Sequence, residues 1–171
     1  DLTNSIMTIY DTGNTIVTDR TGGSGTITLN RLVIDKNDLT DVATVNHPLA
    51  LSGSTSGSTK ALELLTGRLE LNNSNIDITL SSGGTDFSIP QTTALVVQGG
   101  STVRITGNNT GISLDGLLRA EDNAQVNLGD GTTADNRYIQ YSASGNAAIE
   151  LADNAELLVN SQIRRSLFQT S

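Results

Sequence analysis

The feature that most constrains the fold is a pattern that occurs four times along the chain. Each copy is a short alternation of apolar and polar residues, a break of Gly, Asn or Asp, and a second alternation. The copies are Ala61–Leu71, Ala94–Ile105, Leu117–Leu128 and Ala148–Val159. They begin 33, 23 and 31 residues apart. Because strands keep their register while insertions collect in loops, this variable spacing is typical of stacked solenoid coils.

The alternation assigns every side chain of a strand to the core or to solvent. In the second strand of each copy, the residues expected to face outward are Glu70, Arg104, Asn127 and Leu158. In the first strand, they are Glu63, Val96, Arg119 and Glu150. Neighbouring coils stack about 4.8 Å apart. We therefore expect Glu70 beside Arg104, and Arg119 beside Glu150, as two pairs of opposite charge.

A third strand is predicted after each copy, so that each coil holds three. These strands are Ile76–Leu80, Gly111–Leu114, Tyr138–Tyr141 and a segment from Ile163 onward. The breaks that precede the second strands are expected to be equivalent corners, since Gly and Asn tolerate positive φ; they are Gly99-Gly100-Ser101, Asp122-Asn123-Ala124 and Asp153-Asn154-Ala155. The predicted fold is an all-β parallel β-helix, right-handed because parallel crossovers overwhelmingly have that hand.

We predict one β-helix segment over residues 1–171, with regular coils at 61–159 and a terminal coil or cap at 160–171. Residues 1–60 are less regular. Their predicted strands are Ser5–Tyr10, Asn14–Asp19 and Gly25–Asp35. Asp35–Pro48 is predicted as a long loop, within which Asp38–Val45 could form a short helix. Ser52–Thr59, which is rich in Ser, Gly and Thr, is predicted as a mobile loop between coils.

The composition excludes several classes of partner. The net charge is −8 and Lys36 and Lys60 are the only lysines, so no basic stripe exists to bind nucleic acid. The same acidity disfavours anionic membrane surfaces, and no stretch approaches the ~20 apolar residues of a spanning helix. Because aromatic residues make up only 3%, the core must consist of aliphatic side chains in thin layers. Cysteine is absent, which excludes disulfides and thiolate zinc sites.

Three of the repeats resemble the passenger domains of bacterial autotransporters and related filamentous adhesins. The segments that carry the resemblance are Gly-Gly-Ser-Thr-Val-Arg-Ile, Asp-Asn-Ala-Gln-Val-Asn-Leu and Asp-Asn-Ala-Glu-Leu-Leu-Val. Proteins of this kind are right-handed β-helices displayed outside Gram-negative cells, and they are generally poor in cysteine. The resemblance therefore implies export and an extracellular or cell-surface location, but it carries over no binding residue.

Few residues are candidates for catalysis. His47, the only histidine, precedes Pro48 and lacks a nucleophile elbow or oxyanion turn, so a solvated loop residue is the favoured interpretation. Asp77 is expected to have Ser113 and Gln140 as column neighbours. Because that column holds no second acid, the geometry of a glycosidase is not evident. We predict no enzymatic activity and no cofactor.

A calcium site is conceivable around three aspartates, Asp122, Asp130 and Asp135. Their spacing lacks the alternating acids and the terminal Glu of an EF-hand loop. Ordinary turn chemistry explains them, so no metal is predicted.

The favoured function is a non-enzymatic surface module, an adhesin or stalk that contacts host or matrix protein or glycan, or neighbouring cells. The expected binding residues are Glu70, Arg104, Asn127, Leu158, Arg119 and Glu150. The loops that could also contribute are Asp35–Pro48, Gly53–Thr59 and Thr132–Asn136. Two alternatives remain open. One is a carbohydrate-active β-helix, a polysaccharide lyase or glycosidase, and the other is a self-association module for aggregation or biofilm.

Overall fold

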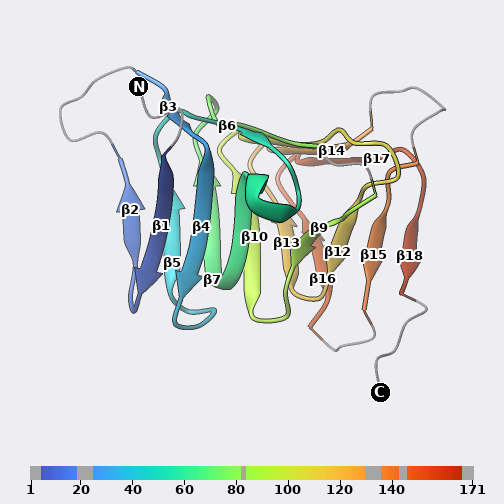
Figure 1. Cartoon of the computed structure of the whole chain (residues 1–171), viewed down its shortest axis with the longest axis horizontal. Coiled ribbons are helices and arrows are strands. Elements are labelled where there is room, and N and C mark those ends of the chain that lie inside the picture. The colour runs from blue at the N-terminus through green and yellow to red at the C-terminus, as the bar shows by residue number, and fades with distance from the viewer. Residues whose placement is uncertain (1–4, 19–24, 82–83, 130–135, 143–145, 167–171) are drawn as a thin grey trace.

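The computed structural model describes residues 5–18, 25–81, 84–129, 136–142 and 146–166. Within them the chain forms eighteen β-strands and one short 3-10 helix, η1 (Gly57–Thr59). The strands are parallel and stack as a β-solenoid of about six turns (Figure 1). The predicted all-β solenoid is therefore confirmed. No helix in the described ranges is long and apolar enough to cross a membrane.

The strands line three faces. Face 1 consists of β1 (Ile6–Asp11), β4 (Arg31–Lys36), the first half of β7 (Leu62–Asn72), β9 (Phe87–Ile89), β12 (Ile112–Leu114), β15 (Ile139–Tyr141) and β18 (Ile163–Arg165). Face 2 consists of β2 (Thr15–Val17), β5 (Val42–Val45), the second half of β7, β10 (Thr93–Gln98), β13 (Leu117–Ala120) and β16 (Ala148–Leu151). Face 3 consists of β3 (Ile27–Leu29), β6 (Leu49–Gly53), β8 (Asp77–Leu80), β11 (Thr102–Ile105), β14 (Gln125–Leu128) and β17 (Glu156–Val159).

The core is a set of inward columns, one residue from each turn. Leu69, Leu95 and Leu118 share one register position on face 2, and each is at most 1% exposed. Phe87 is the largest of the fully buried side chains, and the others of this group are Leu and Ile. Each buried leucine contributes about 1.5–3 kcal/mol relative to an exposed one. Because each turn adds only a thin layer, aliphatic side chains suffice to fill it.

The corner between faces 2 and 3 is formed in three successive turns by two residues with positive φ. The pairs are Gly99–Gly100 (φ 62° and 73°), Asp122–Asn123 (54° and 60°) and Asp153–Asn154 (50° and 62°). The amide of Gly100 donates to the carbonyl of Asp122, and that of Asn123 to the carbonyl of Asp153, at 3.0 Å each. The predicted equivalence of these breaks is confirmed.

The first repeat, in contrast, lies one strand away from its predicted register. Ala61–Leu71 forms almost the whole of β7, which bends at Gly67 (φ 95°) from face 1 onto face 2. Leu69 consequently pairs with Leu95 and not with Val103. The break at Gly67 resembles the others in sequence but turns a different corner. The offset between matching strands is therefore 26 residues, from position 69 to position 95, and not 33.

This displacement also changes one of the predicted third strands. Ile76–Leu80 was predicted as a third strand, in line with those that form β12 and β15 on face 1, but it forms β8 on face 3 and pairs with β11. The face 1 strand of that turn is β9, around Phe87, which the sequence pattern did not indicate. The other predicted third strands are confirmed as β12, β15 and β18.

The N-terminal region is more regular than predicted. Asp35–Pro48 is not a long loop, and no helix forms at Asp38–Val45, because β5 places Ala43 and Val45 in the core at 0% and 2% exposure. The predicted strand Gly25–Asp35 is divided at Asn30 into β3 and β4. An apolar–polar alternation this short is easily mistaken for a loop.

At the other end, the alternation that places Glu150 outside places Leu151 on the core side, in register with Ala120, but Leu151 is 51% exposed. Within the described residues no strand stacks on the far side of β16, so nothing covers this side chain.

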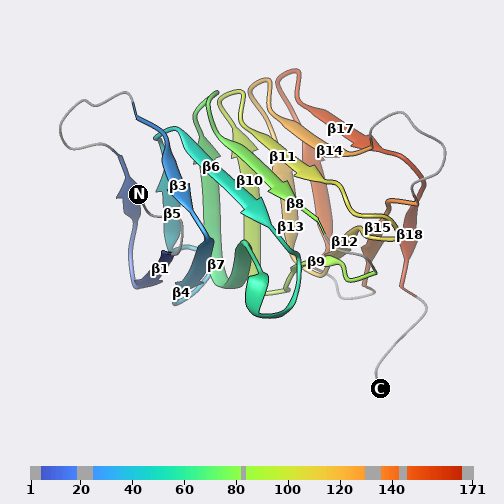
Figure 2. The same cartoon turned by 45° about the horizontal axis from the view of Figure 1, so that its top comes forward.

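Face 1 differs from the other two faces because its ladder is interrupted. Face 3 forms one layer from β3 to β17, and Figure 2 shows its strands side by side. On face 1, the first half of β7 pairs with β4 and β9 pairs with β12, but β7 and β9 do not pair with each other. The wall therefore has an opening between these two strands.

Candidate binding surface

The six residues predicted to bind a partner lie on two different faces. Arg104, Asn127 and Leu158 share an outward register position on face 3, in β11, β14 and β17. The preceding position in that column belongs to Thr79, where the sequence pattern placed Glu70. Three of the four predicted members are therefore neighbours, and the fourth lies elsewhere.

Glu70 belongs instead to an outward column of face 2. The members of this column, in order, are Thr44, Glu70, Val96, Arg119 and Glu150. Glu70 and Arg119 are thus separated by one strand, β10. The predicted binding residues form two surfaces, one with Glu70, Arg119 and Glu150 and one with the remaining three.

The predicted ion pair between Glu70 and Arg104 does not form. Arg104 pairs with Asp77, which lies diagonally across the β8–β11 ladder, two residues before its register partner Thr79. Glu70 pairs with Arg68 of its own strand, with 2.8 Å between Oε1 and Nη2. Both differences follow from the displaced register of the first repeat.

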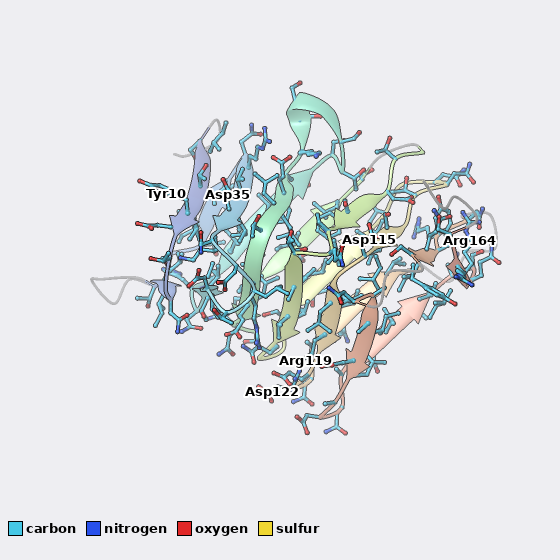
Figure 3. All side chains as sticks on the ribbon, turned by 90° about the horizontal axis from the view of Figure 1, so that it is seen from below. Tyr10, Asp35, Asp115, Arg119, Asp122 and Arg164 are labelled. Carbon is cyan, nitrogen blue, oxygen red and sulfur yellow. The ribbon has the colours of Figure 1, made fainter. Side chains whose placement is uncertain are left out.

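The second predicted pair is confirmed, since Nη1 of Arg119 lies 3.4 Å from Oε2 of Glu150. Arg119 has a closer partner in Glu121, to which its Nε donates at 2.8 Å. This hydrogen bond and the charge of Glu121 raise the pKa of Arg119. Figure 3 shows Arg119 at the margin of the molecule, near Asp122. Its guanidinium group is therefore held at the edge of face 2 by carboxylates.

Face 2 is recessed over β10. Ala94 and Val96 alternate with inward residues and so point outward, yet they are only 3% and 0% exposed. Larger side chains rise beside them, because Arg68 and Leu117 flank Ala94 in register. The result is a groove of about 420 Å³. Its lining includes Leu39, Arg68, Gln91, Ala94, Leu117 and Glu150, and we call it the face-2 groove.

The face-2 groove continues around the corner toward face 1 into a hollow of about 530 Å³. Leu39, Gln91 and Asn146 line both parts. Leu39 stands at the junction, 42% exposed, in the loop between β4 and β5. The carboxylate of Asp38 fixes this loop by accepting from the hydroxyl (2.6 Å) and the amide (2.8 Å) of Thr40, which lowers the pKa of Asp38.

Charged, neutral polar and apolar side chains all line the groove. Arg68 lies on its rim, and its Nε is buried without a hydrogen-bond partner while Nη2 bonds Glu70. Leu39 and Leu117 supply apolar contact on either side of the floor. Such a surface can hold an extended ligand across several turns and fix its orientation by charge.

The remaining chemical candidates are scattered. His47 is 6% exposed in the corner between β5 and β6, and is not the solvated loop residue that was expected. Asp77 does not share a column with Ser113 and Gln140, which neighbour each other on face 1. Asp77 lies on face 3 opposite Thr102.

Two of the three aspartates of the possible calcium site, Asp130 and Asp135, lie outside the described residues. Of the loop Thr132–Asn136, only Asn136 is described. Among the residues that are described, no three His, Asp or Glu side chains come close enough to hold a metal.

Sequence reasoning missed the residues that shape the groove, above all Leu39, Arg68 and Ala94. One local signal for the groove was present in the sequence. Thr93–Val97 contains no charged residue, and its last four residues, from Ala94 onward, are all apolar. Such a run is typical of a strand that is covered on both faces, whereas alternation indicates one solvated face. It predicts that the outer side of this strand is recessed.

Comparison with protein families, curated proteins and solved structures finds no match to this chain.

Proposed function

We propose that the chain is a non-enzymatic binding module of the adhesin or stalk type, displayed on the bacterial surface. The face-2 groove would contact a protein or glycan of a host, a matrix or a neighbouring cell. The observation that carries this proposal is the recess over β10, where outward Ala94 is buried between Arg68 and Leu117 on the floor of the groove. The resemblance of the repeats to autotransporter passenger domains supports the location.

The groove is suited to binding because its floor is rigid. β10 is hydrogen bonded along both edges, to β7 and to β13. A preorganised surface loses little conformational entropy when it binds, so more of the contact energy appears as affinity. Arg68 and Glu150, which line the groove, carry opposite charges and are held by ion pairs to Glu70 and Arg119 respectively. Opposite charges on the rims favour a ligand in one orientation.

A matched pair of variants tests the groove. Leu39→Asp places a charge at the junction of the groove, and Leu158→Asp places the same charge on face 3; the two side chains are 42% and 50% exposed. The purified chain is immobilised, and binding of fibronectin, collagen, a glycan array and epithelial cells is measured. For the ligand that binds, we expect about tenfold weaker binding for Leu39→Asp, since every 1.4 kcal/mol is tenfold, and little change for Leu158→Asp.

Three other results would contradict the proposal. Equal loss in both variants would place the interaction outside the face-2 groove. Turnover of a polysaccharide panel, with or without calcium, would show a carbohydrate-active enzyme. Concentration-dependent association of the purified chain without any other ligand would favour a self-association module.

A further inference from the structure

The opening in face 1 is distinct from the face-2 groove and has its own chemistry. Two successive turns run side by side until the amide of Ser81 donates to the carbonyl of Gly53 (2.8 Å). They are hydrogen bonded again where the amide of Gly67 donates to the carbonyl of Thr92 (3.0 Å). Between these two hydrogen bonds lies a cleft of about 310 Å³. We call it the face-1 cleft.

Both ends of the cleft are closed by threonine hydroxyl groups. Thr55 Oγ1 donates to the carbonyl of Thr85 (2.7 Å) at one end. Thr92 Oγ1 donates to the carbonyl of Leu65 (3.3 Å) at the other end. The cleft is therefore a short slot that opens outward, and a chain cannot be threaded through it lengthwise.

Strand edges form the two long walls. In a parallel ladder, alternate residues direct both their N–H and their C=O groups to the same neighbouring strand. The amide of Leu32 in β4 donates to the carbonyl of Ala61, so the main-chain groups of Leu62 and Leu64 turn to the opposite side, toward the cleft. Their side chains, at 1% and 3% exposure, point into the core. Leu62 and Leu64 thus line the cleft with their backbone.

The same argument applies to the opposite wall. The amide of Phe87 donates to the carbonyl of Gly111, and the carbonyl of Ile89 accepts from Asp115, so both residues face β12. Ser88, which lies between them, directs its N–H and C=O toward the cleft. Pro90 follows and has no N–H to offer.

These walls match the repeat of an extended peptide. Leu62 and Leu64 lie two residues apart, which is about 6.6 Å along a strand at ~3.3 Å per residue. In an extended peptide, the residues that direct their main-chain groups to one neighbouring strand are also two positions apart and have this same spacing. The hydroxyl groups of a sugar do not have this spacing. Unpaired strand edges are general templates for the addition of a strand.

The charges at the cleft are balanced. Lys60 and Arg31 both bind the carboxylate of Glu63, with 3.0 Å between Nζ of Lys60 and Oε1. Asp86 on the other wall accepts from the amide of Gly111 (3.0 Å). Lys60, Glu63 and Asp86 line the cleft, and Arg31 contacts Glu63 from β4. With Arg31 included, two cations offset the two carboxylates, which is complementary to a neutral segment. The outward-facing polar side chains and the inward Phe87 further favour a segment that alternates apolar and polar residues.

We propose that the face-1 cleft binds an extended, uncharged peptide segment of about three residues from a partner protein. The segment would lie between β7 and β9, parallel or antiparallel to them, and restore the interrupted ladder of face 1. Because both ends of the cleft are closed, the ends of the segment leave toward solvent. The apex of a partner loop or a chain terminus has this form.

Amide hydrogen exchange, followed by NMR, tests the geometry in the free protein. The amides of Leu62, Leu64 and Ser88 should exchange much faster than those of Leu69 and Leu71, which belong to strand segments paired on both sides. Slow exchange at all three would show that the edges are already paired, and would overturn the proposal.

The probe for binding is the capped peptide Gly-Ile-Ser-Leu, which copies the sequence around β12, the strand that pairs with the other edge of β9. Its addition should shift the resonances of Leu62, Leu64 and Ser88 and slow their exchange. Methylation of the serine amide of the peptide removes one main-chain donor and should weaken binding about tenfold. Equal binding of the methylated peptide would overturn the proposal. A panel of methyl glycosides that binds where the peptide does not would identify a sugar site.

Two substitutions at one position complete the test. Ser88→Pro removes the N–H that faces the cleft, and Ser88→Ala keeps it. Binding should be lost in the first variant and retained in the second. If Ser88→Pro does not fold, the methylated peptide still decides the outcome. Neither result depends on the face-2 groove, so failure here leaves the proposed adhesive function intact, and failure of that function leaves the face-1 cleft intact.

Discussion

The guanidinium group of Arg164 stacks on the ring of Tyr138, with its Cζ 3.8 Å from the ring centroid. The two residues belong to adjacent turns of face 1, and Figure 3 shows Arg164 at the end of the molecule that holds the last turn. The hydroxyl group of Tyr138 is hydrogen bonded to Asp86, two turns earlier. Tyr138 therefore connects three turns at one corner of the solenoid.

We expect Tyr138→Phe to destabilise the chain by about 1 kcal/mol, because it removes the hydrogen bond to Asp86 and keeps the ring beneath Arg164. For a chain of this size the melting temperature should fall by roughly 2–4 °C. Urea unfolding at pH 7 measures the change. Tyr141→Phe, at a position 37% exposed, is the matched control and should have little effect.

The same tyrosine should make stability depend on alkaline pH. Burial raises the pKa of Tyr138, and the hydrogen bond to Asp86 raises it further. A group whose pKa is higher in the folded state stabilises it fully below the unfolded value of about 10, and this contribution is lost as the pH rises through the folded value. The unfolding free energy of the wild type should therefore decline more steeply above pH ~10 than that of Tyr138→Phe. Parallel curves would contradict this assignment.

Gly111→Ala should be strongly destabilising. A Cβ at this position would overlap the carbonyl oxygen and the ring of Tyr138. Such overpacking costs about 1–3 kcal/mol, and the cost is greater when backbone atoms must move. Gly25→Ala is the control, since nothing lies within 4 Å of its Cβ position. A change of similar size in both variants, measured by thermal unfolding, would contradict the close approach at Gly111.

Glu63 should contribute to stability at neutral pH and lose this contribution in acid. Burial alone raises the pKa of Glu63, but hydrogen bonds from Arg31 and Lys60 outweigh it and hold the pKa below its usual value. A lowered pKa gives stability that is present above the unfolded value of about 4.3 and is lost as the pH falls through the folded value.

Because water still reaches these side chains, we expect Glu63→Gln to cost only about 0.5–1 kcal/mol at pH 7. The variant should also have a shallower acid dependence, measured by urea unfolding between pH 7 and pH 3. Glu156→Gln, whose carboxylate contacts the neutral side chain of Gln125 at 3.4 Å, should change neither property.

The sequence was sufficient to predict the parallel solenoid and the stacking of Arg104 on Asn127 and of Arg119 on Glu150, because alternation and corner chemistry are local properties. It was insufficient for the register of Ala61–Leu71. A glycine between two segments of alternating apolar and polar residues predicts a bend. It does not determine which of the three corners of the coil lies at that bend. That choice depends on which neighbouring turn covers Leu69, and this is a long-range property.

The candidate sites were less predictable than the fold for the same reason. The face-2 groove depends on side chains from three strands and on the loop around Leu39. The face-1 cleft exists because β7 and β9 do not pair with each other. No residue in either strand predicts from the sequence that this pairing is absent. Only the apolar run after Thr93 pointed locally to a covered outer surface.

A charge-reversal experiment separates the observed register from the one that the sequence pattern predicted. Arg104→Glu should destabilise the chain by about 0.5–1 kcal/mol, because it places a second carboxylate beside Asp77 at an exposed position. Adding Asp77→Lys should restore most of the loss, since these two side chains pair across the β8–β11 ladder. Adding Glu70→Lys should not restore it, because Glu70 lies on face 2 and contacts Arg68. Rescue by Glu70→Lys in urea unfolding would instead support the register in which positions 70 and 104 are neighbours.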